Sequence, residues 1–196
     1  MSKVWDRSLS NQKNVELEID LVELFDGQFV PNSSSLRQAV GQAVIDVIRK
    51  RTTDDQQSWT GKSFKDYSPE YADTIEFKAY GKSQKQPNLT QSGDMLGLMT
   101  VKETRDPGKI KIGWDDDLQS EKAHGHITGA VGVKRDFFGL TSGEVSEIKN
   151  RFKDQVEASP ESPNTAEKFK NFLEGRSSIG EKSLNDVLAQ FYGDEG

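Results

Sequence analysis

The chain has 196 residues, of which 33% are hydrophobic and 30% charged, and its 26 basic and 32 acidic side chains give a net charge of −6 at pH 7. This length is enough for one domain with its own core, and the acidic balance argues against nucleic acid as the main ligand. Because there is no cysteine, disulfides, thiolate metal ligands and a cysteine nucleophile are excluded. No apolar run approaches the roughly 20 residues of a membrane span, so we expect no membrane partner.

Two patterns in the first quarter of the chain predict regular structure. Apolar residues occupy every second position over 15–21, which is typical of a half-buried strand. Between Leu36 and Ile48 they recur at steps of three and four, which predicts a long amphipathic helix over 35–50. We expect this helix to pack in the core.

The next stretch is polar and rich in turn residues. Residues 52–66 predict a long loop that is anchored by Trp59 and Phe64. Ser68, Pro69 and Glu70 then have the residue types of a helix start, and we expect one short helix to follow.

The second half of the chain predicts a hairpin and a second long helix. Residues 100–104 and 109–114 alternate on either side of an Asp-Pro-Gly turn, which predicts two paired strands. Thr141 and Glu144 have the spacing of a capping box, and the apolar residues after them predict a helix over 142–156.

Together these elements predict an α+β fold. Residues 1–158 would form the domain, a mixed or antiparallel sheet packed by the two long helices. Residues 159–163 (SPESP) have the composition of a linker, and two short apolar patterns follow, around Phe172 and Leu188. We therefore predict that residues 159–196 form a linker and a C-terminal helical arm, which docks on the domain or on a neighbouring subunit.

No motif identifies a catalytic centre, and we predict no enzyme activity, cofactor or metal ion. The acidic run 115–117 lacks the spaced oxygen ligands of a calcium loop and predicts a solvated turn. His124 and His126 alone make a poor metal site. Ser92, Asp94 and His124 contain the residue types of a hydrolase triad, but the Gly-x-Ser-x-Gly elbow is missing.

Five short segments follow one another in a characteristic order. They are WTGKSFKDYSPEY (59–71), LTQSGDML (89–96), IKIG (110–113), KAHG (122–125) and RDFFGLT (135–141). In this order they resemble the virion morphogenesis family of tailed phages, whose members are tail-completion or neck proteins. The KAHG segment departs from the family pattern because it lacks a tyrosine.

The resemblance implies a structural virion protein of the head-tail neck, assembled in the host cytoplasm. It would form a homo-oligomeric ring, with six-fold and twelve-fold symmetry both open, that completes the tail or joins it to the head connector. Its partners would be neighbouring neck and connector proteins and the tail terminator or tail tube. DNA would pass through the channel without specific binding, and acidic residues facing the channel would keep the duplex from adhering.

A ring subunit needs apolar anchors that are buried in the next subunit or layer. The interface candidates are Arg135, Phe137, Phe138, Leu140, Trp59 and Phe64. Two arrangements of the aromatic pair are open. Either both rings close the domain core, or Phe137 faces inward while Phe138 leans outward beside Gly139.

Two other functions compete with assembly. A small hydrolase would use Ser92 and His124 and needs them within hydrogen-bond reach. A DNA-binding connector would need a basic face, for which the candidates are Lys62, Lys65, Lys78, Lys82 and Lys85.

Overall fold

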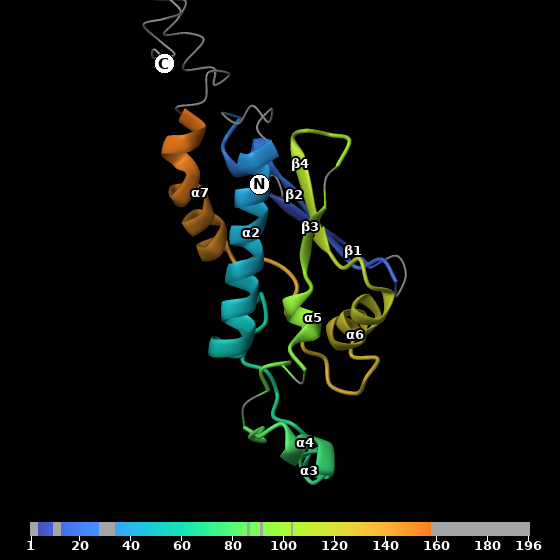
Figure 1. The fold of residues 1–196 in the computed structure, drawn as a ribbon. Coiled ribbons are helices and arrows are strands. Elements are labelled where there is room, and N and C mark those ends of the chain that lie inside the picture. Colours follow the sequence, from blue (N-terminus) through green and yellow to red (C-terminus); the bar gives the residue numbers. More distant parts are fainter. Residues whose placement is uncertain are drawn as a thin grey trace, which may run out of the picture.

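The structure is a computed structural model, and it describes residues 4–9, 13–27, 34–85, 87–90, 92–102 and 104–157. These residues form an α+β fold in which a four-stranded antiparallel sheet packs against helices (Figure 1). The fold class expected from the sequence is confirmed, and the sheet is antiparallel throughout. The expected linker and arm over 159–196 lie outside the described residues.

The sheet has the strand order β1-β2-β4-β3. Its strands are β1 (Trp5–Ser8), β2 (Glu16–Asp20), β3 (Thr100–Lys102) and β4 (Lys109–Gly113). The strand expected near residues 15–21 is therefore β2, and the expected hairpin is β3 and β4. The sequence did not predict β1, which pairs with β2 and forms one edge of the sheet.

The two faces of the sheet follow the alternation of the sequence. Four buried side chains form the inner face: Leu17, Ile19, Ile110 and Ile112. On the outer face, Lys109 Nζ donates to Glu18 at 2.8 Å and Lys111 Nζ donates to Glu16 at 2.8 Å. Glu18 lies directly opposite Lys111 in the register, so these ion pairs run diagonally from β4 to β2. The outer face is thus lined by both signs of charge.

Helix α2 (Ser34–Lys50) confirms the predicted long helix and covers the inner face of the sheet. It approaches β3 through a glycine: a Cβ at Gly41 would lie 2.5 Å from Val101 Cγ2. At its C-terminus the chain widens into a π-helical turn, Arg51–Asp55, which ends at Gln56 with a positive φ of 55°. This turn directs the buried Arg51 side chain into the molecule.

Helix α7 (Ser142–Glu157) packs on α2 and confirms the second predicted helix. Ile148, Phe152 and Val156 are buried beneath it. The predicted capping box is present, since Glu144 N donates to Thr141 Oγ1 at 3.1 Å and Thr141 N donates to Glu144 Oε2 at 2.7 Å. One apolar core therefore extends from β2 to the end of α7.

Several short helices complete the described structure. They are α1 (Leu21–Leu24), α3 (Pro69–Ala72), α4 (Ile75–Ala79) and α5 (Asp94–Gly97). Ser68 caps α3 as expected, but Thr74 caps a separate helix, so the single helix expected here is divided in two. Residues 67–85, which we call the lobe, stand apart from the body of the molecule at the end of α2 (Figure 1). The lobe has an aromatic cluster of Tyr67, Tyr71 and Phe77, with ring centroids 5.2 to 5.4 Å apart.

Helix α6 (Asp117–Thr128) was not expected from the sequence. The acidic run 115–117, expected to be a solvated turn, is its N-terminus, and Asp116 Oδ1 accepts a hydrogen bond from Gln119 N at 3.0 Å. The sequence did not predict this helix because it lacks a clear apolar stripe. It is largely polar and buries few apolar side chains, chiefly Ala123 and Ile127. None of the described helices is both long and apolar enough to cross a membrane.

Candidate interface site

The segment 135–141 (RDFFGLT) joins α6 to α7 through the interior. Phe137 and Phe138 both have 0% of their surface exposed, and Leu140 has 3%. The rings of Phe137 and Phe138 lie 6.4 and 4.9 Å from the ring of Trp114, centroid to centroid. The pair is core packing, and the interpretation in which Phe138 leans outward is wrong. It assumed an extended backbone, whereas Phe137 N donates to Arg135 O at 3.0 Å in a tight turn that breaks the alternation.

Arg51 holds this segment in place. Its guanidinium donates to the Phe137 carbonyl at 2.5 Å and to the Gly139 carbonyl at 2.9 Å, and forms an ion pair with Glu144. Burial lowers the pKa of Arg51, and the Glu144 carboxylate offsets part of that effect. Sequence reasoning missed this residue because an arginine at the end of an amphipathic helix is ordinary there and nothing marks it as buried.

A second arginine attaches β1 to the same segment. Arg7 donates from both terminal nitrogens to the carboxylate of Asp136, and also to the Phe138 carbonyl at 2.9 Å. Trp59 N donates to the Asp136 carbonyl at 3.2 Å, which fixes the loop after α2. Bidentate pairs of this kind fix geometry as well as charge. The segment is therefore the junction of three chain regions that are distant in sequence.

An open hollow lies over this junction, and we call it the tryptophan groove. Its volume is about 670 Å³, and its lining includes Trp5, Trp59, Leu140, Val145 and Ser146. The rings of Trp5 and Trp59 meet edge to face, with centroids 5.1 Å apart and an interplanar angle of 83°.

Gly139 is what allows the two tryptophans to lie so close to the segment. A Cβ at Gly139 would lie 2.9 Å from Trp59 Cγ and 3.0 Å from Trp5 Cη2. Real Cβ atoms do not approach so closely without displacement of the neighbour, so glycine here serves close approach. The groove thus has a fixed shape set by the buried junction.

The interface candidates from the sequence fall into different places. Trp59 and Leu140 line the tryptophan groove. Phe137 and Phe138 lie beneath it in the core. The other two candidates are also buried: Phe64 is 8% exposed, and Arg135 is 5% exposed and faces a different pocket. Trp5 lines the tryptophan groove although the sequence did not predict it as an interface residue. No pattern around Trp5 marked it, because its partners come from other parts of the chain.

The structure also describes the residues expected for a hydrolase and for a DNA-binding connector. Ser92 Oγ accepts a hydrogen bond from Asp94 N at 3.5 Å, and in the described part of the chain no hydrogen bond joins it to His124 on α6. Lys78 pairs with Asp73 at 3.3 Å, and Lys82 Nζ lies 5.3 Å from the centre of the Tyr67 ring, so two of the five candidate lysines are engaged within the lobe. Lys62, Lys65 and Lys85 are exposed.

Among the described residues, no group of three or more His, Cys, Asp and Glu side chains could hold a metal ion. Comparisons of the chain with protein-family models, with curated proteins and with solved structures found no match.

Proposed function

We propose that this chain is a structural subunit of the head-tail neck of a tailed-phage virion. There it forms a ring that completes the tail or joins it to the head connector. The proposal is supported by the order of short segments that resembles the virion morphogenesis family. One structural observation carries it: the WTGKSFKDYSPEY segment and the RDFFGLT segment, far apart in sequence, meet at the tryptophan groove through the hydrogen bond from Trp59 N to the Asp136 carbonyl.

A closed ring of identical subunits needs two different surfaces, because each copy contacts the next head to tail. The tryptophan groove supplies one of them. The lobe supplies the other: Ile75 is 86% exposed and Tyr80 is 53% exposed, and both lie at its α4 end. Figure 1 shows α3 and α4 projecting from the body, where a second copy can reach them.

We propose that Ile75 and Tyr80 of one copy occupy the tryptophan groove of the next. Burying an isoleucine side chain contributes about 1.5 to 3 kcal/mol, and two aromatic walls add edge contacts for Tyr80. This is too little for a stable ring by itself, so the isolated chain is monomeric or weakly associated and the ring forms on neighbouring neck proteins. DNA then passes through the ring without specific binding.

Two surface substitutions test the proposed contact. Ser146→Arg places a bulky charge at the edge of the groove, on an exposed position of α7, and Ile75→Asp removes the apolar tip of the lobe. Each substitution leaves the other surface intact. We therefore expect each variant to be absent from particles, and a mixture of the two to form pairs that cannot close into a ring even when the neighbouring neck proteins are present. Leu98→Asp, at a 51% exposed position outside the groove and the lobe, is the control.

Incorporation is measured by the protein composition of purified particles, and position by imaging the head-tail joint. Folding of each variant is checked by thermal unfolding, which should agree with the parent chain within about 1 kcal/mol. Particles that incorporate both variants normally would refute the contact. A chain located away from the head-tail joint, or absent from particles altogether, would refute the function itself.

A further inference from the structure

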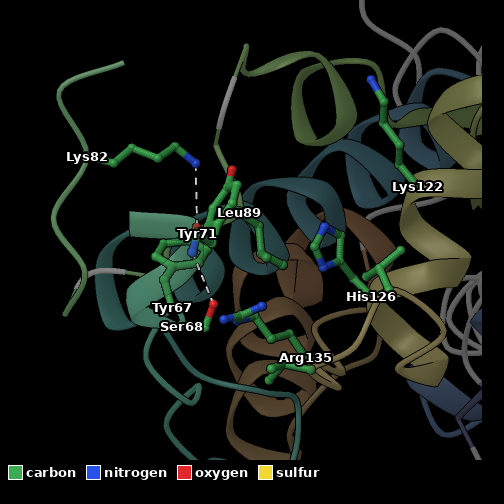
Figure 2. Close-up of a pocket in the computed structure, with 10 residues that line it drawn as sticks. Tyr67, Ser68, Tyr71, Lys82, Leu89, Lys122, His126 and Arg135 are labelled. Carbon is green, nitrogen blue, oxygen red and sulfur yellow. Dashed lines mark hydrogen bonds between the residues drawn. The ribbon is translucent and has the colours of Figure 1, made fainter. Parts of the chain in front are cut away.

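A second hollow, which we call the basic pocket, lies between the lobe, α6 and residues 131–135. Its volume is about 320 Å³. Its lining includes Tyr67, Tyr71, Lys82, Lys122, His126 and Arg135 (Figure 2). Of the described residues, no aspartate or glutamate lines it. The pocket therefore gathers three cations without a carboxylate to balance them.

Arg135 is the central cation. It is 5% exposed, and its guanidinium carbon lies 4.8 Å from the centre of the Tyr67 ring. One terminal nitrogen donates to the backbone carbonyls of Lys65 and Asp66, at 3.0 and 3.4 Å. Its Nε is buried and has no hydrogen-bond partner among the described residues. A buried charge is normally paired, because desolvation costs several kcal/mol per ion when it is not.

Arg51 shows what this chain does with a buried arginine that serves structure alone. Arg51 is equally buried at 5% exposure and its Nε also has no hydrogen-bond partner among the described residues, but it has Glu144 as an ion-pair partner. In the described part of the chain Arg135 has no such carboxylate. The difference indicates that the partner of Arg135 comes from outside these residues.

The neighbours of Arg135 in the pocket also lack a negatively charged partner within the described chain. His126 Nδ1 is buried without a hydrogen-bond partner, and burial together with the charges of Arg135 and Lys82 lowers the pKa of His126 to about 4. Burial and the charge of Arg135 also lower the pKa of Lys82. Figure 2 shows Lys82 reaching the Tyr67 hydroxyl, at 3.5 Å, while Lys122 lies at the edge of the pocket. A negative charge added to the pocket would offset the repulsion between these cationic groups.

We propose that the basic pocket binds a carboxylate carried on an apolar body. The carboxylate would pair with the guanidinium of Arg135, because a guanidinium presents planar donors that match the two oxygens of a carboxylate. The rest of the wall is aromatic and aliphatic, with Leu89, Val131 and Val133. These apolar side chains would be covered by the body of an organic carboxylate, whereas inorganic phosphate would leave them bare. This site does not depend on the proposed place of the chain in the neck.

The experiment is a titration of the full chain, followed by NMR at the Arg135 Nε–H and at the His126 ring. Benzoate is the probe, benzamide is its neutral counterpart of nearly equal shape, and inorganic phosphate is the competing anion. We expect benzoate to give a saturable one-to-one shift and benzamide to give none. Arg135→Gln should abolish binding, and the rim variant Lys82→Gln with Lys122→Gln should weaken it about tenfold, the usual effect of losing a charge-assisted hydrogen bond.

Arg49→Gln is the matched control, because Arg49 also donates to backbone carbonyls, those of Leu96 and Gly97, but does not line the pocket. It should bind benzoate as the parent chain does. The rim variant keeps the test valid if Arg135→Gln fails to fold. Equal shifts with benzamide, tighter binding of phosphate than of benzoate, no saturable shift, or unchanged binding in the rim variant would each overturn the proposal.

Discussion

Arg51 and Glu144, 93 residues apart in sequence, form an ion pair through the same carboxylate oxygen that closes the capping box of α7. Glu144 Oε2 accepts from Thr141 N at 2.7 Å and from the Arg51 guanidinium. One carboxylate therefore accepts the hydrogen bond of the amide that precedes α7 and neutralises the cation that holds the carbonyls of residues 137 and 139. The Glu144 carboxylate thereby links the start of α7 to the turn that follows α2.

Glu144→Gln should destabilise the protein by about 3 to 5 kcal/mol, the cost of leaving the buried Arg51 without its counter-charge. Thr141→Ala should cost only about 1 kcal/mol, because it removes the cap and leaves the ion pair. Urea unfolding of both variants measures the difference. A Glu144→Gln variant no less stable than Thr141→Ala would mean that the ion pair contributes nothing.

Phe137→Ala and Phe138→Ala should each cost about 3 to 5 kcal/mol, because both rings are completely buried against Trp114. Leu98→Ala, at an exposed position, should stay within about 0.5 kcal/mol. The free energy of unfolding decides the matter. If Phe138→Ala were as mild as the control, the ring would have to be exposed in solution.

Gly41→Ala should destabilise the protein by about 1 to 3 kcal/mol, although alanine is the better helix former, because its Cβ would overlap the stiff Val101 side chain. The double variant Gly41→Ala with Val101→Ala should recover part of the loss. A double-mutant cycle by chemical unfolding gives the coupling. Additive effects would show that α2 and β3 do not touch there.

Acid should weaken the protein through His126. Its pKa in the folded chain is about 4 against an ordinary 6.5, so the unfolded chain binds more protons between these values. The stability that neutral His126 contributes is complete above pH 6.5 and is lost as pH falls through 4, up to about 3 kcal/mol at 1.36 kcal/mol per pH unit.

The measurement is unfolding at several pH values in the parent chain, in His126→Gln and in the control His124→Gln on the same helix. His126→Gln should flatten the slope between pH 4 and 6.5, and His124→Gln should keep it. The idea fails if His126→Gln leaves the slope unchanged.

Removal of residues 159–196 should leave the rest of the chain folded, because the buried apolar side chains of the described core lie between Val15 and Val156. Thermal unfolding of the truncated chain should remain cooperative, with a similar midpoint. A broad, non-cooperative transition would show that residues 159–196 contribute to the core. Full-length protein is the reference.

The sequence predicted the elements whose signals are local. Apolar steps of three and four identified α2 and α7, alternation identified β2 and the hairpin, and two residues identified the capping box. The interpretation of Phe138 failed because alternation presumes an extended backbone, which residues 135–138 lack.

The candidate site could be predicted only in part. Trp59 and Leu140 were among the candidates, but Trp5, Arg7 and Arg51 reach the site from segments far away in sequence. Their roles depend on which carbonyls and rings they meet after folding. No spacing within the chain reports such contacts.

The two edge strands of the sheet affect the tendency of the protein to aggregate at high concentration. Both edge strands are very short, with four residues in β1 and three in β3. A foreign strand would find few unpaired backbone groups to extend. We therefore expect the sheet to resist growth into fibrils, so that crowded copies would meet through side chains rather than through strand addition.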